Sequence, residues 1–502
     1  MDPSPKKLKM KEESSTPELI SGPNLAERLP NEVMYEIFRR VPLPALTKLE
    51  LVCKHWKSII RYHQSLWKES FLQEDVAFEQ KDFCALHSFQ IVPKLIERNG
   101  GKLSSVFLPI SLKHVNNEDI EAILNALPAS EVQHLWIVMG AELHCCHTHQ
   151  CRRRSWIATP YKRMVKMVIK AVTQCSKLKT LRLVSTKDVS IVTHKPKKSP
   201  EWPLANCKLD RLSLIGITIG SLFVDETMFA TLSALRTLEI ANEAETKNEE
   251  EMAEATRVLR ALEVSKDTLD ECRLLCSFYH LDKAAKEHEL LRQPKGALWF
   301  SNLKKLTLNF ERGFSDICWL DYSNVRHLNL QGLRDPTAIL KVPKAEMLTT
   351  LQVEVPLQVS ELAKCLEQYK LLQHLSIRFS VASKGPVFFC EIKHTLMNLP
   401  LEELTVHGKL EHQGDEIVDL VRARKSNLSS TKIKTVTVAR CKNVNFTNKR
   451  WLEENVENLQ IWDWKISNGV NRINYEYEGL HFFEVESSRL RAMVDPSSKR
   501  YS

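Results

Sequence analysis

Glycine is scarce in this chain, with 14 glycines among 502 residues. No glycine-rich loop of the kind that cradles phosphate groups is present, and neither the H-E-x-x-H nor the G-x-S-x-G pattern occurs. No pair of carboxylates has the arrangement of an acid–base site. These absences exclude the common nucleotide-binding, metalloprotease and serine-hydrolase classes. The sequence therefore predicts a protein that is not an enzyme and that carries no cofactor.

Long apolar runs are also missing. Stretches such as 135–140 (LWIVMG) are far shorter than the roughly 20 residues that a membrane span needs. The first apolar run lies behind PSPKKLKMKEESS, so the N-terminal segment has no apolar centre of the signal-peptide type. We expect a soluble protein of the cytoplasm, the nucleus or both, with no membrane partner.

The cysteine content and the net charge are both compatible with an intracellular protein. The 13 cysteines are odd in number and scattered, which favours free, buried thiols in a reducing compartment. The formal net charge of +9 is mild for 502 residues. It favours acidic partners weakly and does not by itself indicate nucleic acid.

Residues 1–24 have the composition of a disordered basic tail, because they contain few large apolar side chains whose burial could offset the entropy of ordering. Lys6, Lys7, Lys9 and Lys11 form a basic cluster within it. The cluster is either a nuclear-import signal or a solvated lysine tail, and both interpretations stay open.

Residues 25–72 predict three short helices. Pro30 suits the start of a helix, and apolar residues then recur at helical spacing through Val41. Pro42 and Pro44 place a turn. A second helix is expected from Pro44 onward, and a third element begins at Leu66.

The order of residues in this segment resembles the F-box. The chain has Leu29-Pro30-Asn31-Glu32-Val33, Ile37-Phe38, Leu43 with Leu46, Val52-Cys53-Lys54-His55-Trp56 and Leu66-Trp67, which follow the family pattern over about 40 residues. Phe38 and Val41 depart from it in a small way, because the family more often has an aliphatic residue and a leucine there. The resemblance implies docking on a Skp-type adaptor, which bridges to cullin and RING subunits.

Carried over by position, the resemblance implies one set of adaptor-binding residues. They are Leu29, Pro30, Glu32, Ile37, Leu43, Leu46, Val52 and Trp56. A unit this small must use apolar side chains both for its own core and for any partner. Ile37, Leu49 and Trp56 are therefore open to the alternative that they only pack the helices together.

A six-residue pattern, apolar-x-x-apolar-x-apolar, recurs from about residue 100 to residue 462. Its twelve instances begin at residues 103, 132, 178, 209, 235, 303, 325, 348, 372, 401, 433 and 456. Most intervals are 22 to 32 residues long, which fits a strand, a turn and a returning helix. Stacked strands would bury a ladder of leucines that no single repeat could bury alone.

The array resembles the leucine-rich-repeat family in a divergent, irregular form. The expected fold is α/β, with a short three-helix F-box followed by a curved leucine-rich-repeat solenoid of about 12 irregular strand–helix repeats. The expected domains are a tail at 1–24, the F-box at 25–72, the solenoid at 73–462 with insertions near 140–175 and 242–300, and a C-terminal cap and tail at 463–502.

The second insertion has an amphipathic character. Met252, Ala255, Leu259 and Leu262 fall on one helical stripe, and Leu269, Cys272, Leu275 and Phe278 fall on another. We expect one or two helices laid against the convex side of the array. A partner-binding arm is the alternative.

Strand residues between the inward-facing leucines should line the concave face and bind a target protein. The predicted substrate-binding residues are Trp136, Arg182, Arg211, His327, His374, Arg378 and His407. Exposed tryptophan, arginine and histidine suit protein recognition, and the basic excess suggests an acidic or phosphorylated segment. The alternative at any one of these positions is a solvated face.

The first insertion contains a cluster of histidine and cysteine residues. Its six candidate zinc ligands are His144, Cys145, Cys146, His147, His149 and Cys151. The spacing matches no known zinc finger, and so few intervening residues rarely let four ligands reach one tetrahedral centre. We therefore predict a polar loop with incidental thiols and no metal site, with zinc as the alternative.

Together these features predict a non-catalytic substrate-recognition subunit of a cullin–RING ubiquitin ligase with an unknown protein substrate. Two alternatives remain. One is an F-box protein with a non-degradative scaffold role, and the other is a repeat-type binding protein whose N-terminal helices only cap the array.

Overall fold

The structure is a computed structural model of the 502-residue chain. It describes residues 29–41, 46, 48–63, 66, 105–111, 117–127, 132–140, 161–189, 202–241, 248–276, 278–287, 298–310, 320–321, 323–332, 346–355, 359–379, 390–407, 414–427, 431–439 and 446–462. The chain divides into two compact units, Met1–Ser70 and Phe71–Ser502. Each unit is described by itself.

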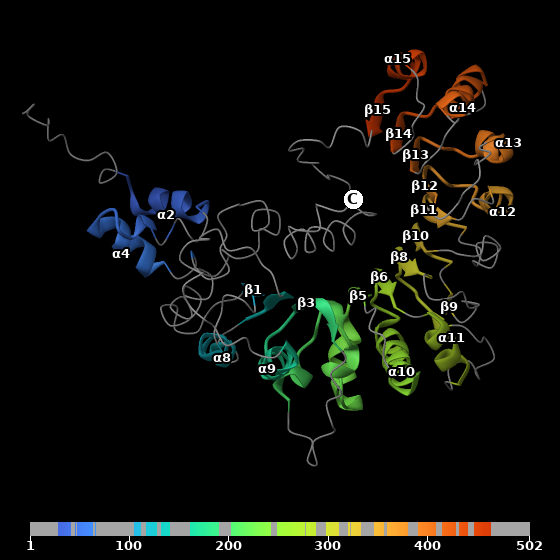
Figure 1. Ribbon diagram of the computed structural model, residues 1–502. Coiled ribbons are helices and arrows are strands. Elements are labelled where there is room, and N and C mark those ends of the chain that lie inside the picture. The colour runs from blue at the N-terminus through green and yellow to red at the C-terminus, as the bar shows by residue number, and fades with distance from the viewer. Residues whose placement is uncertain are drawn as a thin grey trace, which may run out of the picture. The chain divides into compact units, whose positions relative to one another are not determined.

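The first unit contains α2 (Asn31–Arg39) and α4 (Lys54–Tyr62) (Figure 1). Pro30 directly precedes α2, and its carbonyl accepts the N–H groups of Val33 and Met34 at 3.0 and 3.1 Å. Proline suits this position because the first N–H groups of a helix have no intrahelical partner. Leu46, Lys48 and Leu49 are helical between the two helices, and Leu66 is helical after them.

The second helix expected from Pro44 onward is interrupted before α4. Cys53 is extended, with φ −155° and ψ 166°, and its Sγ accepts the N–H of Trp56 at 3.4 Å. Apolar spacing alone does not reveal this break, because the residues on both sides of it keep the helical period. The cap turns the chain so that α4 can pack on α2.

A small apolar core holds this unit together. Its buried members are Met34, Phe38, Leu46, Ile59, Ile60 and Leu66. The rings of Phe38 and Trp56 meet edge to face with centroids 5.4 Å apart. Such a pair adds about 0.5–1.5 kcal/mol beyond the burial of apolar area.

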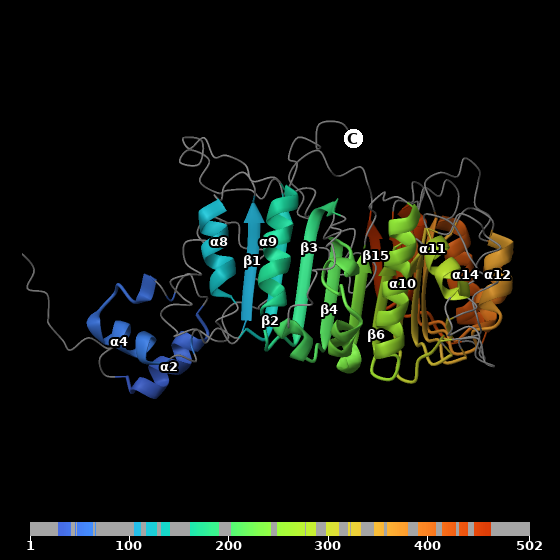
Figure 2. The same cartoon turned by 90° about the horizontal axis from the view of Figure 1, so that it is seen from below.

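The second unit is built on one parallel sheet, which has thirteen strands in its described part (Figures 1 and 2). The strands are β1 (Ser105–Ser111), β2 (His134–Gly140), β3 (Thr180–Val189), β4 (Arg211–Ile217), β5 (Thr237–Ala241), β6 (Glu271–Leu275), β8 (Lys305–Asn309), β10 (His327–Gln331), β11 (Thr350–Val355), β12 (His374–Phe379), β13 (Glu403–His407), β14 (Thr435–Ala439) and β15 (Asn458–Trp462). They follow one another across the sheet in sequence order. A short pair, β7 (Leu298–Trp299) and β9 (Leu320–Asp321), forms a separate two-stranded sheet.

The strand register aligns the apolar residues of successive repeats into two rows. The first row runs Val106, Leu135, Leu181, Leu212, Leu238, Cys272, Leu306, Leu328, Leu351, Leu375, Leu404, Val436 and Leu459. The second row lies two residues further along each strand and begins with Leu108. All members of the first row before Leu459 are buried. The rows form the predicted ladder, and all twelve motif positions coincide with strands.

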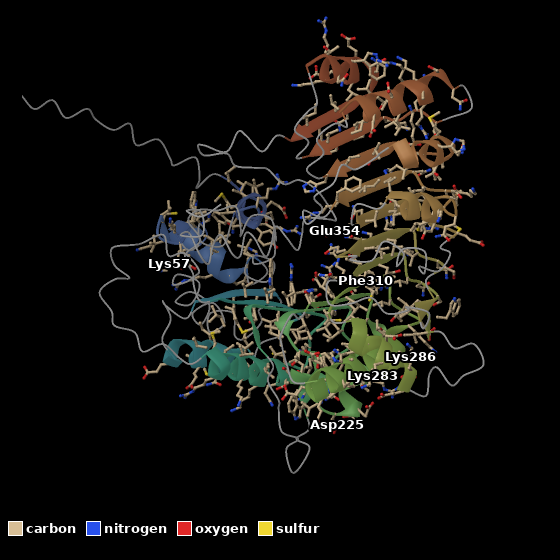
Figure 3. All side chains as sticks on the ribbon, turned by 45° about the vertical axis from the view of Figure 1, so that its right-hand side comes forward. Lys57, Asp225, Lys283, Lys286, Phe310 and Glu354 are labelled. Atoms are coloured by element: carbon tan, nitrogen blue, oxygen red, sulfur yellow. The ribbon has the colours of Figure 1, made fainter. Side chains whose placement is uncertain are left out.

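Helices and short 3-10 turns cover the outer face of the sheet (Figures 1 and 2). They are α8 (Asn117–Ala126), α9 (Tyr161–Thr173), η2 (Pro203–Asn206), η3 (Ile219–Ser221), η4 (Glu226–Ala234), α10 (Asn248–Ser265), α11 (Phe278–Glu287), α12 (Val359–Leu366), α13 (Cys390–Asn398), α14 (Gly414–Ser426) and α15 (Phe446–Asn455). Figure 3 shows Lys283 and Lys286 of α11 on this outer side, away from Glu354 on the inner side. Among the described residues, no helix is both long enough and apolar enough to cross a membrane.

The interval predicted as an insertion near 242–300 contains a full repeat. It holds α10 and then β6, which pairs with β5 and β8. The six residues from Leu269 to Leu274 fit the motif, with Cys272 where the other repeats have leucine or valine. Burial raises the pKa of the Cys272 thiol, so it stays neutral and packs as a small apolar side chain. The six-residue pattern does not predict this strand, because Cys272 stands where the pattern has a larger aliphatic residue.

Two helical stripes were predicted in the same interval. The one that includes Cys272 and Leu275 is wrong, because these residues lie in the strand β6. The other stripe is confirmed. Ala255, Leu259 and Leu262 are buried on α10, on the outer side of the array, while Met252 is half-buried. An insertion was also predicted near 140–175, and the part of it that the structure describes consists of α9 and the turn after it. The helix α9 packs against the neighbouring outer helix α8.

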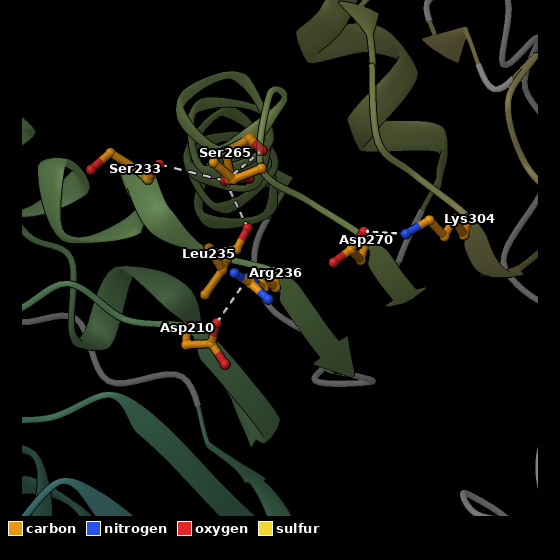
Figure 4. A network of polar contacts seen from close by, with 8 residues as sticks. Asp210, Ser233, Leu235, Arg236, Ser265, Asp270 and Lys304 are labelled. Atoms are coloured by element: carbon orange, nitrogen blue, oxygen red, sulfur yellow. Dashed lines mark hydrogen bonds and ion pairs between the residues drawn. The ribbon is translucent and has the colours of Figure 1, made fainter.

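Polar contacts join consecutive repeats at the edge of the sheet where the strands begin (Figure 4). Arg236 pairs with Asp210 at 3.4 Å, and Lys304 pairs with Asp270 at 3.1 Å. The hydroxyl of Thr268 donates to the carbonyl of Leu235 at 2.8 Å. Exposed ion pairs contribute only about 0–1 kcal/mol each, so the buried rows supply most of the stability.

Candidate functional site

The helical unit exposes apolar side chains that its own core does not use. Val33 and Ile37 are each 44% exposed, and their spacing of four residues places them on one side of α2. Leu51 and Val52, just before α4, are 84% and 59% exposed. In a soluble domain an exposed apolar cluster commonly marks a site of association.

The predicted adaptor-binding residues divide between surface and core. Pro30, Glu32, Ile37 and Val52 are exposed, and Leu29 and Trp56 are half-buried. Leu46 is only 1% exposed, so it can support a docking surface but cannot contact a partner directly. Leu43 lies outside the described residues. For Ile37 the alternative of pure helix packing is disfavoured, whereas Trp56 packs on Phe38.

Sequence reasoning missed Val33 and Leu51 as surface residues. Val33 precedes Met34, which is buried, and Leu51 follows the buried Glu50. The signal for Val33 is present in the sequence, since it lies four residues before Ile37 on the same helical stripe. No comparable signal exists for Leu51, because its exposure follows from the break before Cys53.

The inner face of the sheet carries the strand residues that alternate with the buried rows. Its central row begins Phe107, Trp136, Arg182, Ser213, Glu239, Arg273, Thr307, Asn329, Gln352 and Ser376. The position two residues earlier on each strand carries a second row, which includes His134, Thr180, Arg211, Thr237 and Glu271. Both rows are rich in polar and charged groups.

A pocket of about 170 Å³ opens where these two rows cross β2 to β6. Its lining residues are His134, Leu135, Trp136, Thr180, Arg182, Arg211, Ser213, Thr237, Glu239, Glu271 and Arg273. Three predicted substrate-binding residues, Trp136, Arg182 and Arg211, therefore come together at one site.

The Trp136 and Arg182 side chains form the floor at one end of this pocket. The Arg182 guanidinium carbon lies 4.5 Å from the centre of the Trp136 ring, a cation–π contact between neighbouring strands. Trp136 is 4% exposed and Arg182 7% exposed. The prediction that both are exposed is thus wrong, because both side chains are buried in the lining of the pocket, in contact with each other across the paired strands β2 and β3. Arg211 on β4 is exposed.

His134 contributes a hydrogen bond at the rim of the pocket. Its Nδ1 lies 3.0 Å from the Thr180 hydroxyl. Burial, together with the nearby Lys179, lowers the pKa of His134 below its ordinary value of 6.5. At neutral pH the ring is therefore uncharged, and the positive charge of the pocket comes from its arginines.

The opposite end of the pocket is acidic. The Ser213 hydroxyl donates to Glu239 Oε2 at 2.5 Å. Arg273 Nη1 lies 3.7 Å from Glu239 Oε1, and Arg273 Nε donates to Glu271 Oε1 at 2.9 Å. Glu239, Ser213 and Arg273 were not among the predicted site residues. Nothing in the sequence distinguishes Ser213 and Glu239 from other polar strand residues, and Arg273 belongs to the repeat that the six-residue pattern does not predict.

The other predicted substrate-binding residues lie further along the inner face, outside this pocket. His374 Nδ1 is 2.9 Å from Glu403, and Arg378 is 3.9 Å from Glu354. Burial and the neighbouring Lys305 lower the pKa of His327, so it adds no charge at neutral pH. His407 is half-buried on β13. Arg378 and His407 are register partners on β12 and β13, and His374 is close enough to contribute to the lowered pKa of His327, but none of the four lines the pocket.

The candidate metal cluster at residues 144–151 lies outside the described residues. Within the described ranges, no group of three or more histidine, cysteine, aspartate or glutamate side chains is placed to hold a metal ion. The prediction about zinc therefore stays a prediction.

Comparison with known proteins identifies a family match for the first unit, the one that contains α2 and α4. A family model described as F-box-like matches residues 26–73. This segment contains α2, α4 and the exposed apolar residues between Val33 and Val52. No curated protein matches the chain.

Proposed function

We propose that this protein is a substrate-recognition subunit of a cullin–RING ubiquitin ligase. The F-box-like segment would dock on a Skp-type adaptor, and the repeat array, of the leucine-rich-repeat type, would hold the target protein. The observation that carries the proposal is the exposed apolar surface at Val33, Ile37, Leu51 and Val52 within the F-box-like match. F-box domains generally bind adaptors of this type.

The arrangement of the inner face supports the second part of the proposal. Arg211 is exposed at the pocket on the inner face, on a strand that is paired on both sides, and a site on such a rigid frame loses little entropy when a partner binds. In this proposal the chain contributes no bond-making residue. It raises the effective concentration of the target near the ubiquitin-loaded conjugating enzyme and orients the target lysine.

Adaptor binding tests the proposal. The double variant Ile37→Glu/Val52→Glu places two charges on the exposed apolar surface and leaves the buried core intact. We expect its affinity for the purified Skp-type adaptor, measured by calorimetry on the full chain, to fall at least about 30-fold, as for the loss of an interface hot spot.

Lys57→Glu is the matched control, because Lys57 is an exposed residue of α4 that gains the same glutamate (Figure 3). It should bind the adaptor within about twofold of the wild type, since surface substitutions outside a hot spot usually have small effects. Equal affinity of the double variant and the wild type would overturn the docking assignment. So would an absence of adaptor binding by the wild type.

A further inference from the structure

Asn329 on β10 is a buried polar side chain whose hydrogen-bonding groups are not satisfied within the described residues. The residue is 6% exposed, and neither Oδ1 nor Nδ2 has a hydrogen-bond partner there. Leu328 and Leu330 belong to the buried rows, so alternation along the strand places the Asn329 side chain on the inner face of the sheet. Buried amide groups in proteins are usually paired, because burial removes the hydrogen bonds that they make with water. A ligand that both donates and accepts would satisfy Asn329.

The inner-face row that contains Asn329 is uncharged from β8 to β15. Its members, in register across adjacent strands, are Thr307, Asn329, Gln352, Ser376, Thr405, Thr437 and Gln460. Each of them carries a hydroxyl or a carboxamide group. Between β3 and β6 the same row carries Arg182, Glu239 and Arg273 instead. The part of the row from β8 onward therefore suits a ligand that is neutral and rich in hydrogen-bonding groups.

The strand β10 presents no charged side chain to the inner face at neutral pH. Its inner-face residues are His327, Asn329 and Gln331. Burial and the neighbouring Lys305 lower the pKa of His327 below its ordinary value of 6.5, so its ring is uncharged. A charged group of a ligand would therefore find no partner on β10, whereas a neutral group would find hydrogen bonds.

The Asn329 carboxamide has the same hydrogen-bonding groups as a peptide unit. In a hydrogen-bonded pair of an antiparallel sheet, one residue donates its N–H to the partner and accepts an N–H with its own C=O. Nδ2 of Asn329 can donate to such a C=O, and Oδ1 can accept such an N–H. Both hydrogen bonds can thus be made with one residue of an extended segment. They involve no side chain of that segment, so they select its conformation and not its sequence.

The neighbours of Asn329 in the row can bind the adjacent main-chain groups. Thr307 on β8 and Gln352 on β11 are its register partners, and neighbouring strands are about 4.8 Å apart. Main-chain groups that face the same side of an extended segment recur every two residues, or about 6.6 Å. The longer side chain of Gln352 can bridge the difference. Gln352 is half-buried and His327 is exposed, and side chains at such positions commonly change rotamer when a partner binds.

We propose that the inner face at Asn329 binds the main chain of an extended, uncharged segment of the target, with Nδ2 donating to a carbonyl and Oδ1 accepting the N–H of the same residue. Gln352 binds the next main-chain group that faces the array. The proposal rests on the proposed function, because it specifies how the repeat array holds its target.

Retention of peptide pools on the immobilised full chain tests the contact with the main chain. The probes are acetylated, amidated nonapeptides of mixed uncharged residues, and matched pools in which the three central peptide bonds are replaced by esters. An ester can keep the extended shape but has no N–H group. We expect the wild type to retain the amide pool about tenfold more than the ester pool, since the buried Oδ1 then stays without a donor. Equal retention would overturn the assignment, because recognition would then lie in the side chains of the peptides.

The variant Asn329→Leu removes the carboxamide and keeps a side chain of similar size. It should lose the preference for the amide pool. Without peptide it should melt about 2–5 °C above the wild type, because it no longer buries a donor and an acceptor without partners. A merely structural carboxamide would instead lower the melting temperature when it is removed. A preference that persists in Asn329→Leu, or a melting temperature that does not rise, would overturn the assignment.

Asn398→Leu is the matched control. Asn398 is an exposed carboxamide at the end of α13, on the outer side of the array, and it receives the same substitution. The variant should keep the wild-type preference for the amide pool and a melting temperature close to that of the wild type. Loss of the preference in Asn398→Leu as well would overturn the assignment to the inner face.

The two proposals fail separately in these measurements. Asn329→Leu should bind the Skp-type adaptor as the wild type does, because Asn329 belongs to the second unit. If the preference for the amide pool is absent while adaptor binding persists, only the assignment of Asn329 is wrong. If adaptor binding fails while the preference for the amide pool persists, the main-chain site stands and the ligase role does not.

Discussion

Arg424 is a charged side chain that is almost fully buried, with 1% exposure. Its guanidinium donates to the carbonyls of Leu399 at 2.9 Å, Leu401 at 3.2 Å and Thr431 at 2.7 Å, and also to that of Leu396. Burial lowers its pKa to about 10, which keeps it protonated at neutral pH. Arg424 therefore provides donors for a carbonyl in the last turn of α13 and for carbonyls of the irregular backbone around it, in two consecutive repeats.

Glu254 is a second ionisable group held inside the array. Its carboxylate accepts the N–H of Gly220 at 3.0 Å and also the N–H of Ile219, and it lies 3.7 Å from Arg257. Burial raises its pKa from 4.5 to about 7, although those N–H groups and Arg257 act in the opposite direction. The carboxyl group connects α10 to η3, and it does so in an environment that favours its neutral form.

The raised pKa of Glu254 predicts a pH-dependent stability. In the folded protein the group holds its proton up to about pH 7, whereas in the unfolded chain it loses the proton near pH 4.5. The contribution of Glu254 to the free energy of unfolding is fully present below pH 4.5 and is lost as pH rises through about 7. Glu254→Gln should therefore gain stability relative to the wild type between pH 4.5 and pH 8, by on the order of 3 kcal/mol at most.

The measurement is the urea midpoint of variant and wild type at several pH values. Glu250→Gln is the control, because Glu250 is exposed on the same helix. Its difference from the wild type should stay constant with pH. A constant difference for Glu254→Gln as well, or one that shrinks as pH rises, would contradict the assignment.

At the scale of the element, β4 contains a backbone position that requires glycine. Gly216 has φ +67°, and a Cβ placed there would lie 2.5 Å from the carbonyl oxygen of Ser185 on β3. The register between β3 and β4 shifts at this point, between Val184 and Val189. The bulge and the close approach of the two strands both depend on the absence of a side chain.

Gly216→Ala should destabilise the array by more than about 2 kcal/mol, because the left-handed conformation costs roughly 1 kcal/mol and the contact with Ser185 adds to it. Gly332→Ala at φ +63° is the matched control for the conformation. Thermal unfolding of both variants measures the difference. Equal melting temperatures for the two would show that β3 can move away without cost.

The repeat that contains β6 shows how far an element can depart from its pattern and still form. Cys272 contributes less apolar volume than the leucine in most of the neighbouring repeats, yet β5 and β8 fix the strand register on both sides. A strand in the middle of a sheet forms hydrogen bonds with neighbours on both sides. It therefore tolerates a smaller apolar side chain in the buried row. A pattern search that includes cysteine would find this repeat.

At the scale of the whole molecule, the two compact units differ in how much core they possess. The buried rows of the array run through Phe71–Ser502 and include no residue of the first unit. A fragment of residues 71–502 should therefore keep its folded structure. Its melting temperature, measured by circular dichroism, should lie within a few degrees of that of the corresponding transition in the full chain.

The first unit should behave differently. A helical segment of this size is marginal alone, so residues 1–70 should unfold at lower temperature and gain stability when the adaptor is added. Loss of structure in the 71–502 fragment would show instead that the helices are part of the core of the array.

The sequence by itself determined the repeating strands other than β6, the buried rows and the helical spacing of the apolar residues of α2. Each of these follows from a local period of two or about four residues, and local periods can be read along a single chain. The F-box-like order of residues was equally visible, and the family comparison matches the same segment.

Only the tertiary structure decided which side chains meet. The pairing of β2 with β3 brings Arg182 over the Trp136 ring, and the strand β6 brings Arg273 to Glu239. Leu46 is buried and Leu51 exposed because the chain turns at Cys53, not because their apolar character differs. These outcomes depend on contacts between residues about 25 to 50 positions apart or on the break of a helix, and the local period of the sequence contains neither.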